Sequence, residues 1–163
     1  MQVYFFRLEK IPSLILMKLL PLLLSLSFLP LFGQTQTNDN ACLENYPLHI
    51  VVMGSSTAAG TGPSHPDSTW VNRYRRALQA INPAHRVTNI ARGGYNTYRL
   101  MPSSFVPPPG LPLPDSTKNI TQAISLSPDA IIINLPSNDA ALNVSAATQM
   151  QNFRTMVDSA QLA

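Results

Sequence analysis

The sequence predicts an α/β domain built on a parallel sheet. Three apolar segments, near residues 48–53, 86–90 and 130–135, have the length and composition of buried strands. Segments in which apolar residues recur at helical spacing alternate with them. Strands that alternate with helices are typical of a parallel sheet. At 163 residues, the chain is long enough for one such domain.

The first 33 residues have the order of a secretory signal peptide. Basic residues precede an almost wholly apolar run, Leu19–Phe32, and the small residue Gly33 then leads into a polar stretch. Cleavage after Gly33 would make the protein secreted or periplasmic, with no stable membrane insertion. An uncleaved anchor is the alternative, which is disfavoured because the run is short and holds two prolines. Met17 is a second candidate start, with residues 1–16 then an over-extended reading frame.

Charge and cysteine content exclude several function classes. The predicted signal holds three of the 11 Lys and Arg residues and one of the eight Asp and Glu residues, so the remainder is close to neutral. Nothing in it forms a basic run, and we expect no nucleic-acid partner. Cys42 is the one cysteine of the sequence, which excludes an intramolecular disulfide. No Cys/His cluster has metal-ligand spacing, so we expect neither a metal nor a cofactor.

The elements follow in order. Residues 34–46 are polar and are predicted to be a flexible lead-in to a folded part that covers 47–163. After the first strand, a helix capped by Asp67 or Ser68 is predicted to run to about Asn82, with its apolar residues on one face. The second strand, at 86–90, comes next.

The second half begins with a proline-rich loop. Residues 102–117 hold six prolines, which exclude a regular helix or a central strand. A long surface loop is the prediction, and a proline-rich ligand for a partner is the alternative. A helix capped by Asp115 or Ser116 is predicted to follow. The run at 130–135 fits a central parallel strand, and residues 144–162 have the spacing of a final helix.

The first strand opens into a run of small residues, Gly54-Ser55-Ser56-Thr57-Ala58-Ala59-Gly60. In open α/β sheets, ligands bind at the carboxyl ends of the strands. Small residues let the backbone turn sharply and leave a serine hydroxyl uncovered, as a serine nucleophile requires. A structural turn without chemistry is the alternative. A phosphate-binding loop is disfavoured because its Gly-Lys-Ser/Thr ending is absent.

Two further segments follow the next two strands. The second segment is Asn89-Ile90-Ala91-Arg92-Gly93-Gly94-Tyr95-Asn96-Thr97, and the third is Leu135-Pro136-Ser137-Asn138-Asp139. Taken in this order, the three segments resemble the sequence blocks of the SGNH (GDSL-type) hydrolases. Ser55 stands where that family usually has Asp, and Pro136 stands where it has Gly.

The resemblance implies a flavodoxin-like, three-layer α/β/α domain that hydrolyses acyl esters of small molecules or carbohydrates. Ser56 would attack the ester carbonyl. The backbone N–H groups of Ser56 and Gly94, with Gly93 as second choice, and the side-chain amide of Asn138 would hold the oxyanion. No cofactor or metal is implied, and the oligomeric state is not predicted.

The general base of the family has no counterpart in the sequence. The family supplies it from an Asp-x-x-His pair near the C-terminal end of the domain, and no histidine follows His85 here. His49 and His85 precede strands and are expected at the opposite end of the sheet, whereas His65 lies in the loop after the first segment. We therefore expect a domain incomplete at its C-terminus, with near-zero esterase activity on its own. An inactive fragment or a non-catalytic, secreted carbohydrate-binding module is the alternative. Three strands would also leave an apolar sheet edge uncovered.

Overall fold

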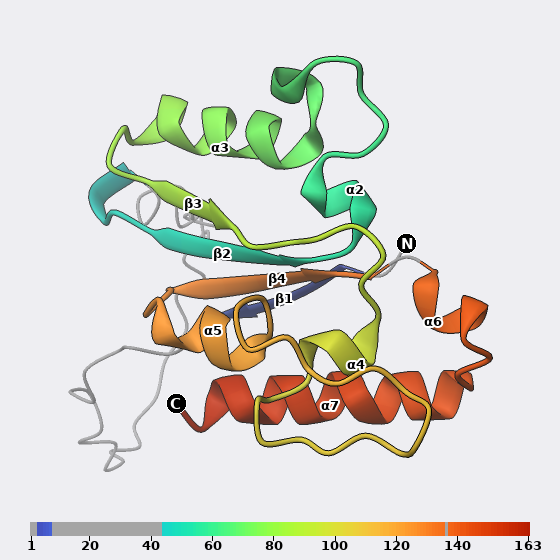
Figure 1. Cartoon of the computed structure of the whole chain (residues 1–163). Helices are drawn as coiled ribbons and strands as arrows, with labels where there is room; N and C mark the ends of the chain where they lie inside the picture. The colour runs from blue at the N-terminus through green and yellow to red at the C-terminus, as the bar shows by residue number, and fades with distance from the viewer. Residues whose placement is uncertain (1–2, 8–43, 136) are drawn as a thin grey trace, which may run out of the picture.

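The structure is a computed structural model that describes residues 3–7, 44–135 and 137–163 (Figure 1). Outside these residues lie the predicted cleavage site after Gly33, most of the flexible lead-in, Cys42 and Pro136. Within the described part, no helix is both long enough and apolar enough to cross a membrane.

The three predicted strands form the parallel part of one sheet. They are β2 (His49–Gly54), β3 (Arg86–Asn89) and β4 (Ala130–Asn134), and β2 lies between the other two. Val51 of β2 pairs with Thr88 on one side and Ile131 on the other, in parallel register. The parallel α/β prediction is therefore confirmed.

A fourth strand was not predicted. β1 (Val3–Arg7) pairs antiparallel with β4 and covers the edge that three strands alone would leave open. These residues belong to the predicted signal peptide. Cleavage after Gly33 would remove β1 and expose β4 again, so the processed and the full-length chain must differ at this edge.

Helices cover both faces of the sheet (Figure 1). On one face lie α2 (Ser56–Ala59) and α3 (Trp70–Ile81). On the other lie α4 (Thr97–Leu100), α5 (Ile120–Ser125) and α7 (Ala146–Gln161). The short α6 (Asn138–Ala141) follows β4 and lies beyond the carboxyl ends of the strands. The expectation of three layers, α/β/α, is met by this arrangement.

The central strands contribute side chains to two hydrophobic cores, one on each face of the sheet, because successive side chains point to opposite faces. Ile50 and Val52 of β2 pack in the core beneath α3, whereas Val51 and Met53 pack in the core beneath α7. All six residues of β2 and all five of β4 are buried. Burial on both faces is the reason that these strands appear in the sequence as continuous apolar runs.

Two helix starts differ from the predictions. Asp67 and Ser68 lie in a short 3-10 helix, η1 (Pro66–Ser68), and the side chain of Thr69 caps α3 instead. Asp115 does not cap α5. That helix begins later, after Asn119, whose Oδ1 accepts a hydrogen bond from the N–H of Gln122 at 3.0 Å. Asp115 Oδ1 instead accepts the N–H of Thr117 at 2.9 Å, so its capping capacity is used within the loop.

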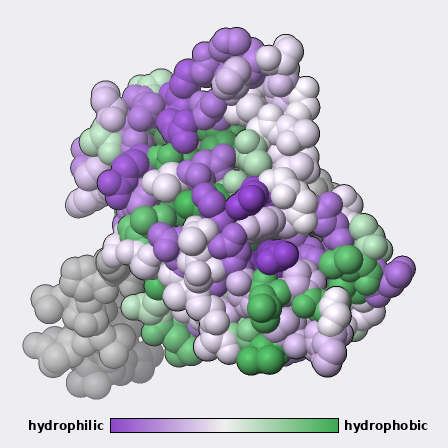
Figure 2. Space-filling model, viewed as in Figure 1, coloured by the Kyte–Doolittle hydropathy of each residue, from purple (hydrophilic) through white to green (hydrophobic). Residues whose placement is uncertain are grey.

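The proline-rich loop lies on the surface, as predicted. Figure 2 shows apolar residues low on this face, where the loop passes α7, and beside them at α6. The exposed apolar residues of these segments are Val106, Leu113 and Leu142. The loop therefore covers the helical layer and leaves some apolar surface of its own in water.

Candidate active site

The three predicted segments all begin at the same end of the sheet, where the parallel strands have their carboxyl ends. The chain leaves β2, returns as β3 on one side of it and then crosses to β4 on the other side. Parallel sheets open a ligand crevice at the carboxyl ends of their strands where the strand order reverses in this way. Each segment follows the carboxyl end of one of these strands.

The first segment is anchored tightly to the end of β4. Gly54 has φ +150°, and a Cβ on it would lie 2.2 Å from the carbonyl oxygen of Asn134, so no side chain fits here. The N–H of Ser55 donates to that oxygen at 3.0 Å. Thr57 Oγ1 donates to Asn134 Oδ1 at 2.6 Å. These contacts fix the turn from which α2 starts.

The two adjacent serines have different environments. Ser55 precedes α2 and is fully buried. Ser56 is the first residue of α2 and is half-buried. The N–H of a first helical residue has no acceptor within its own helix. Ser56 is therefore the more exposed serine of this pair, and its N–H has no acceptor within α2.

Gly94 lies in an open part of the second segment. Its φ is +79°, in the left-handed region, and a Cβ on it would meet no atom within 4 Å. Gly93 is equally open, but only Gly94 lines the pocket described below. This difference favours Gly94 over Gly93 as the residue whose N–H faces a ligand.

Asn138 joins the three segments through one atom. Its Nδ2 donates to Ser55 Oγ at 2.6 Å and to the carbonyl oxygen of Tyr95 at 2.8 Å. A carbonyl oxygen only accepts, so the Tyr95 contact determines which end of the amide faces the first two segments. Both amide hydrogens are engaged, and an oxyanion would have to compete with one of these acceptors.

The neighbour of Asn138 holds α6 in place. Both carboxylate oxygens of Asp139 accept the N–H of Thr97, at 3.1 and 3.0 Å, and Thr97 Oγ1 donates to Oδ1 at 2.5 Å. Asn152 Nδ2 of α7 donates to Thr97 Oγ1 at 2.8 Å. All three residues are buried. This network connects α6 to α4 and α7, and the sequence pattern gave Asp139 no such role.

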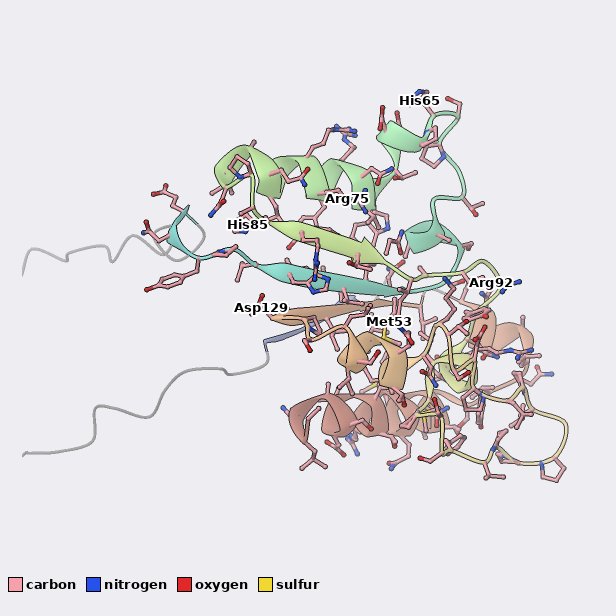
Figure 3. All side chains as sticks on the ribbon, turned by 60° about the vertical axis from the view of Figure 1, so that its left-hand side comes forward. Met53, His65, Arg75, His85, Arg92 and Asp129 are labelled. Atoms are coloured by element: carbon pink, nitrogen blue, oxygen red, sulfur yellow. The ribbon has the colours of Figure 1, made fainter. Side chains whose placement is uncertain are left out.

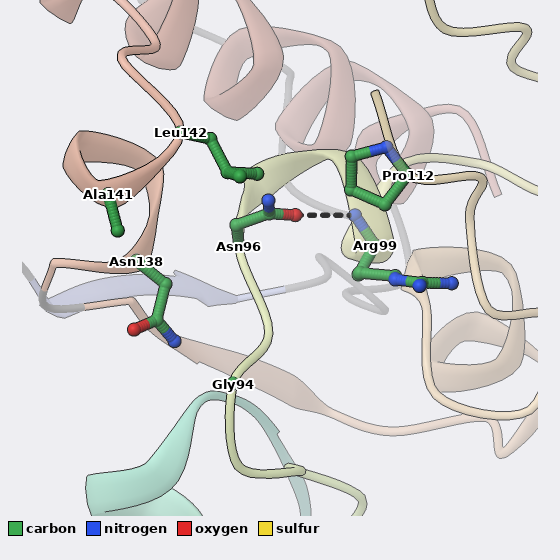
Figure 4. Close-up of a pocket in the computed structure, with 7 residues that line it drawn as sticks. All are labelled: Gly94, Asn96, Arg99, Pro112, Asn138, Ala141 and Leu142. Carbon is green, nitrogen blue, oxygen red and sulfur yellow. Dashed lines mark hydrogen bonds between the residues drawn. The ribbon is translucent and has the colours of Figure 1, made fainter. Parts of the chain in front are cut away.

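A pocket of about 260 Å³ lies beside Asn138 (Figure 4). Its lining residues come from the second segment, α4, the proline-rich loop and α6: Gly94, Asn96, Arg99, Pro112, Asn138, Ala141 and Leu142. Two of the three predicted site residues, Gly94 and Asn138, are among them. Ser56 is not, although its neighbour Ser55 contacts Asn138. Arg99, Pro112, Ala141 and Leu142 were not singled out, because no strand-end pattern marks them.

No hydrogen bond in the described part of the chain joins a histidine to the three segments. His49 contacts Thr88 Oγ1 and Arg86. Burial lowers the pKa of His49, and the positive charge of Arg86 lowers it further. His85 Nδ1 accepts the N–H of Leu48 at 3.0 Å. Figure 3 shows His85 near the end of the sheet opposite Arg92, and His65 beyond the first helical layer. Exposed His65 pairs with Asp67.

The described residues contain no set of side chains that could bind a metal ion. Within residues 3–7, 44–135 and 137–163, no group of three or more His, Cys, Asp or Glu side chains is placed to hold an ion. The hydrogen-bond donors that follow the strand ends are the side-chain amide of Asn138 and the backbone N–H groups of Ser56 and Gly94.

A family model described as the GDSL-like Lipase/Acylhydrolase family matches residues 52–163, which is more than half of the chain. The match begins within β2 and contains all three segments. No curated protein and no solved structure matches the chain.

Proposed function

Because this chain belongs to the GDSL-like lipase/acylhydrolase family, whose members are ester hydrolases in general terms, we propose that it cleaves acyl esters with Ser56 as nucleophile. Small-molecule and carbohydrate esters are the substrates that we propose. The proposal includes secretion, on the strength of the signal-like sequence before Gly33.

The contact of Asn138 with two other segments is the observation that supports this proposal most. One amide nitrogen lies 2.6 Å from the residue before Ser56 and 2.8 Å from the residue after Gly94. Asn138 Nδ2 therefore contacts the sequence neighbours of both other residues that the proposal needs, Ser56 and Gly94. Gly94 and Asn138 also line the same pocket.

The proposed reaction follows from these positions. Ser56 Oγ bonds to the carbonyl carbon, and the carbonyl oxygen becomes an oxyanion. The N–H groups of Ser56 and Gly94 and the Asn138 amide stabilise it, each contributing about 3 kcal/mol to the lowering of the barrier. Collapse of the tetrahedral intermediate breaks the bond to the alcohol, and water then hydrolyses the acyl-serine. A base must take the Ser56 proton as the bond forms and give it to the departing alcohol. None of the three histidines bonds to Ser55 or Asn138, so imidazole supplied from solution takes this role in the test below.

Added imidazole tests this account, because it can replace the missing base. We expect the chain alone to turn over p-nitrophenyl acetate at a near-zero rate. With imidazole, we expect turnover above the solution rate, abolished in Ser56→Ala and lowered about 10²-fold in Asn138→Ala. Ser68→Ala, in the exposed 3-10 helix, is the matched control and should match the wild type.

Two results would speak against the proposal. Imidazole-dependent turnover that survives in Ser56→Ala would remove Ser56 from the reaction. Binding of an acetylated oligosaccharide, with no Ser56-dependent turnover of any ester, would favour a carbohydrate-binding module. Secretion has its own test, since mass spectrometry of the exported protein should find Gln34 as its first residue.

A further inference from the structure

The proline-rich loop, residues 102–117, is fastened at both ends. At its start, the N–H of Ser103 donates to Thr121 Oγ1 at 3.0 Å, and Asn119 Nδ2 donates to Ser103 Oγ at 2.9 Å. Near its end, the N–H of Asp115 donates to the carbonyl of Arg99 at 3.0 Å. Arg99 Nη1 returns a bond to the carbonyl of Leu113 at 3.2 Å. Prolines restrict the backbone between these points further, because their rings fix φ.

A further fastening of the loop reaches the candidate site. The Tyr95 hydroxyl donates to the carboxylate of Asp115. This bond and those from Thr117 lower the pKa of Asp115 to about 2, so the acceptor is ionised at neutral pH. We call the Tyr95–Asp115 bond the latch.

Tyr95 therefore has two contacts of different kinds. Its carbonyl accepts the Asn138 amide, and its hydroxyl holds the loop. The ring between them is buried, with 8% of the residue exposed. The loop places Pro112 in the wall of the pocket, and Figure 4 shows Pro112 beside Arg99, across from Ala141.

We propose that the latch is a positioning contact that holds Pro112 as a fixed wall and so limits the site to esters with short acyl groups. The inference rests on the proposed function. In this proposal the acyl chain enters the pocket beside Asn138, where Pro112 forms part of the wall. The bonds of Arg99 and Ser103 hold the ends of the loop, and the latch adds the contact that keeps Pro112 from moving aside. Loss of the latch should let the wall retreat and admit longer chains.

The experiment compares p-nitrophenyl acetate, butyrate and octanoate, with imidazole present. In the wild type, the acetate rate should exceed the octanoate rate by at least about tenfold, the discrimination that a closely fitting pocket gives. Tyr95→Phe and Asp115→Asn should each lower this ratio. Tyr98→Phe is the matched control. Tyr98 is also buried and lies on α4 against Phe105 of the loop, but it makes no bond to Asp115 among the described contacts.

Hydrogen–deuterium exchange on the same variants separates the two proposals. The hydrogen-bonded amides of Leu111 and Asp115 should exchange at least about tenfold faster in Tyr95→Phe than in the wild type and in Tyr98→Phe. Unchanged exchange would overturn the latch, and faster exchange with an unchanged acyl ratio would overturn its role in specificity. If the wild type turns over no ester, the proposed function fails together with the specificity role, while the exchange result still decides whether the latch holds the loop.

Discussion

Removal of one buried hydroxyl tests how the helix that bears Asn138 is held. Thr97→Val keeps the shape of the side chain, so it creates no cavity, but it deletes the donor to Asp139 and the acceptor for Asn152. A hydrogen bond to a charged group contributes about 1.5–3 kcal/mol, and a buried donor left without an acceptor costs about 1–3 kcal/mol. Asp139 keeps the N–H of residue 97. We expect a loss of about 3 kcal/mol in the free energy of unfolding.

Urea unfolding at 25 °C, followed by circular dichroism and by the fluorescence of Trp70, measures this loss. Thr155→Val is the control. Thr155 is half-buried on α7 and its hydroxyl bonds only within its own helix, so its replacement should change stability by less than about 0.5 kcal/mol. A loss below about 1 kcal/mol in Thr97→Val would refute the reasoning, because the network would then not fix α6.

Three further predictions concern other parts of the fold. Gly54→Ala should destabilise the protein by more than about 4 kcal/mol, seen as loss of the cooperative thermal transition, because its Cβ would lie 2.2 Å from a backbone oxygen; a normal transition would contradict the strand contact. Gly94→Ala should cost only about 1 kcal/mol of stability but at least about tenfold in imidazole-dependent turnover, because its methyl group points into open space beside the proposed N–H donor; unchanged turnover would exclude residue 94. The pKa of Asp115 is lowered from 3.8 to about 2 in the folded state, so its stabilising effect is complete above about pH 4 and is lost as the pH falls towards 2. Urea unfolding at a series of acid pH values should therefore show the stability difference between the wild type and Asp115→Asn shrinking over that range. A difference that stays constant would contradict the assigned role of Asp115.

The parallel sheet and the order of its elements could be predicted because burial on both faces leaves a plain signal. The runs at 50–53 and 130–135 are almost wholly apolar, and each ends in small or polar residues. Helix starts were less predictable. Several capping residues stand close together before α3 and α5, and tertiary contacts decide among them, as the use of Asp115 by Thr117 and Tyr95 shows.

The candidate site could be predicted only where its residues follow strand ends. Gly94 and Asn138 were predicted from the strand ends together with the family resemblance, and both line one pocket. The partner of Asn138, Ser55, was noted only as a departure from the family pattern. Arg99 and Pro112 come from a helix and an irregular loop, whose path depends on contacts between distant residues rather than on local periodicity. β1 was missed because its residues also fit a signal peptide.

The central claim is that Ser56, Gly94 and Asn138 act on the same carbonyl group. Its most direct test is reaction of the chain with a fluorophosphonate in the presence of imidazole, followed by peptide mapping of the phosphonylated residue by mass spectrometry. The account predicts modification at Ser56, slowed at least about tenfold in both Asn138→Ala and Gly94→Ala. Modification at another residue, or labelling of Ser56 that neither variant slows, would contradict it.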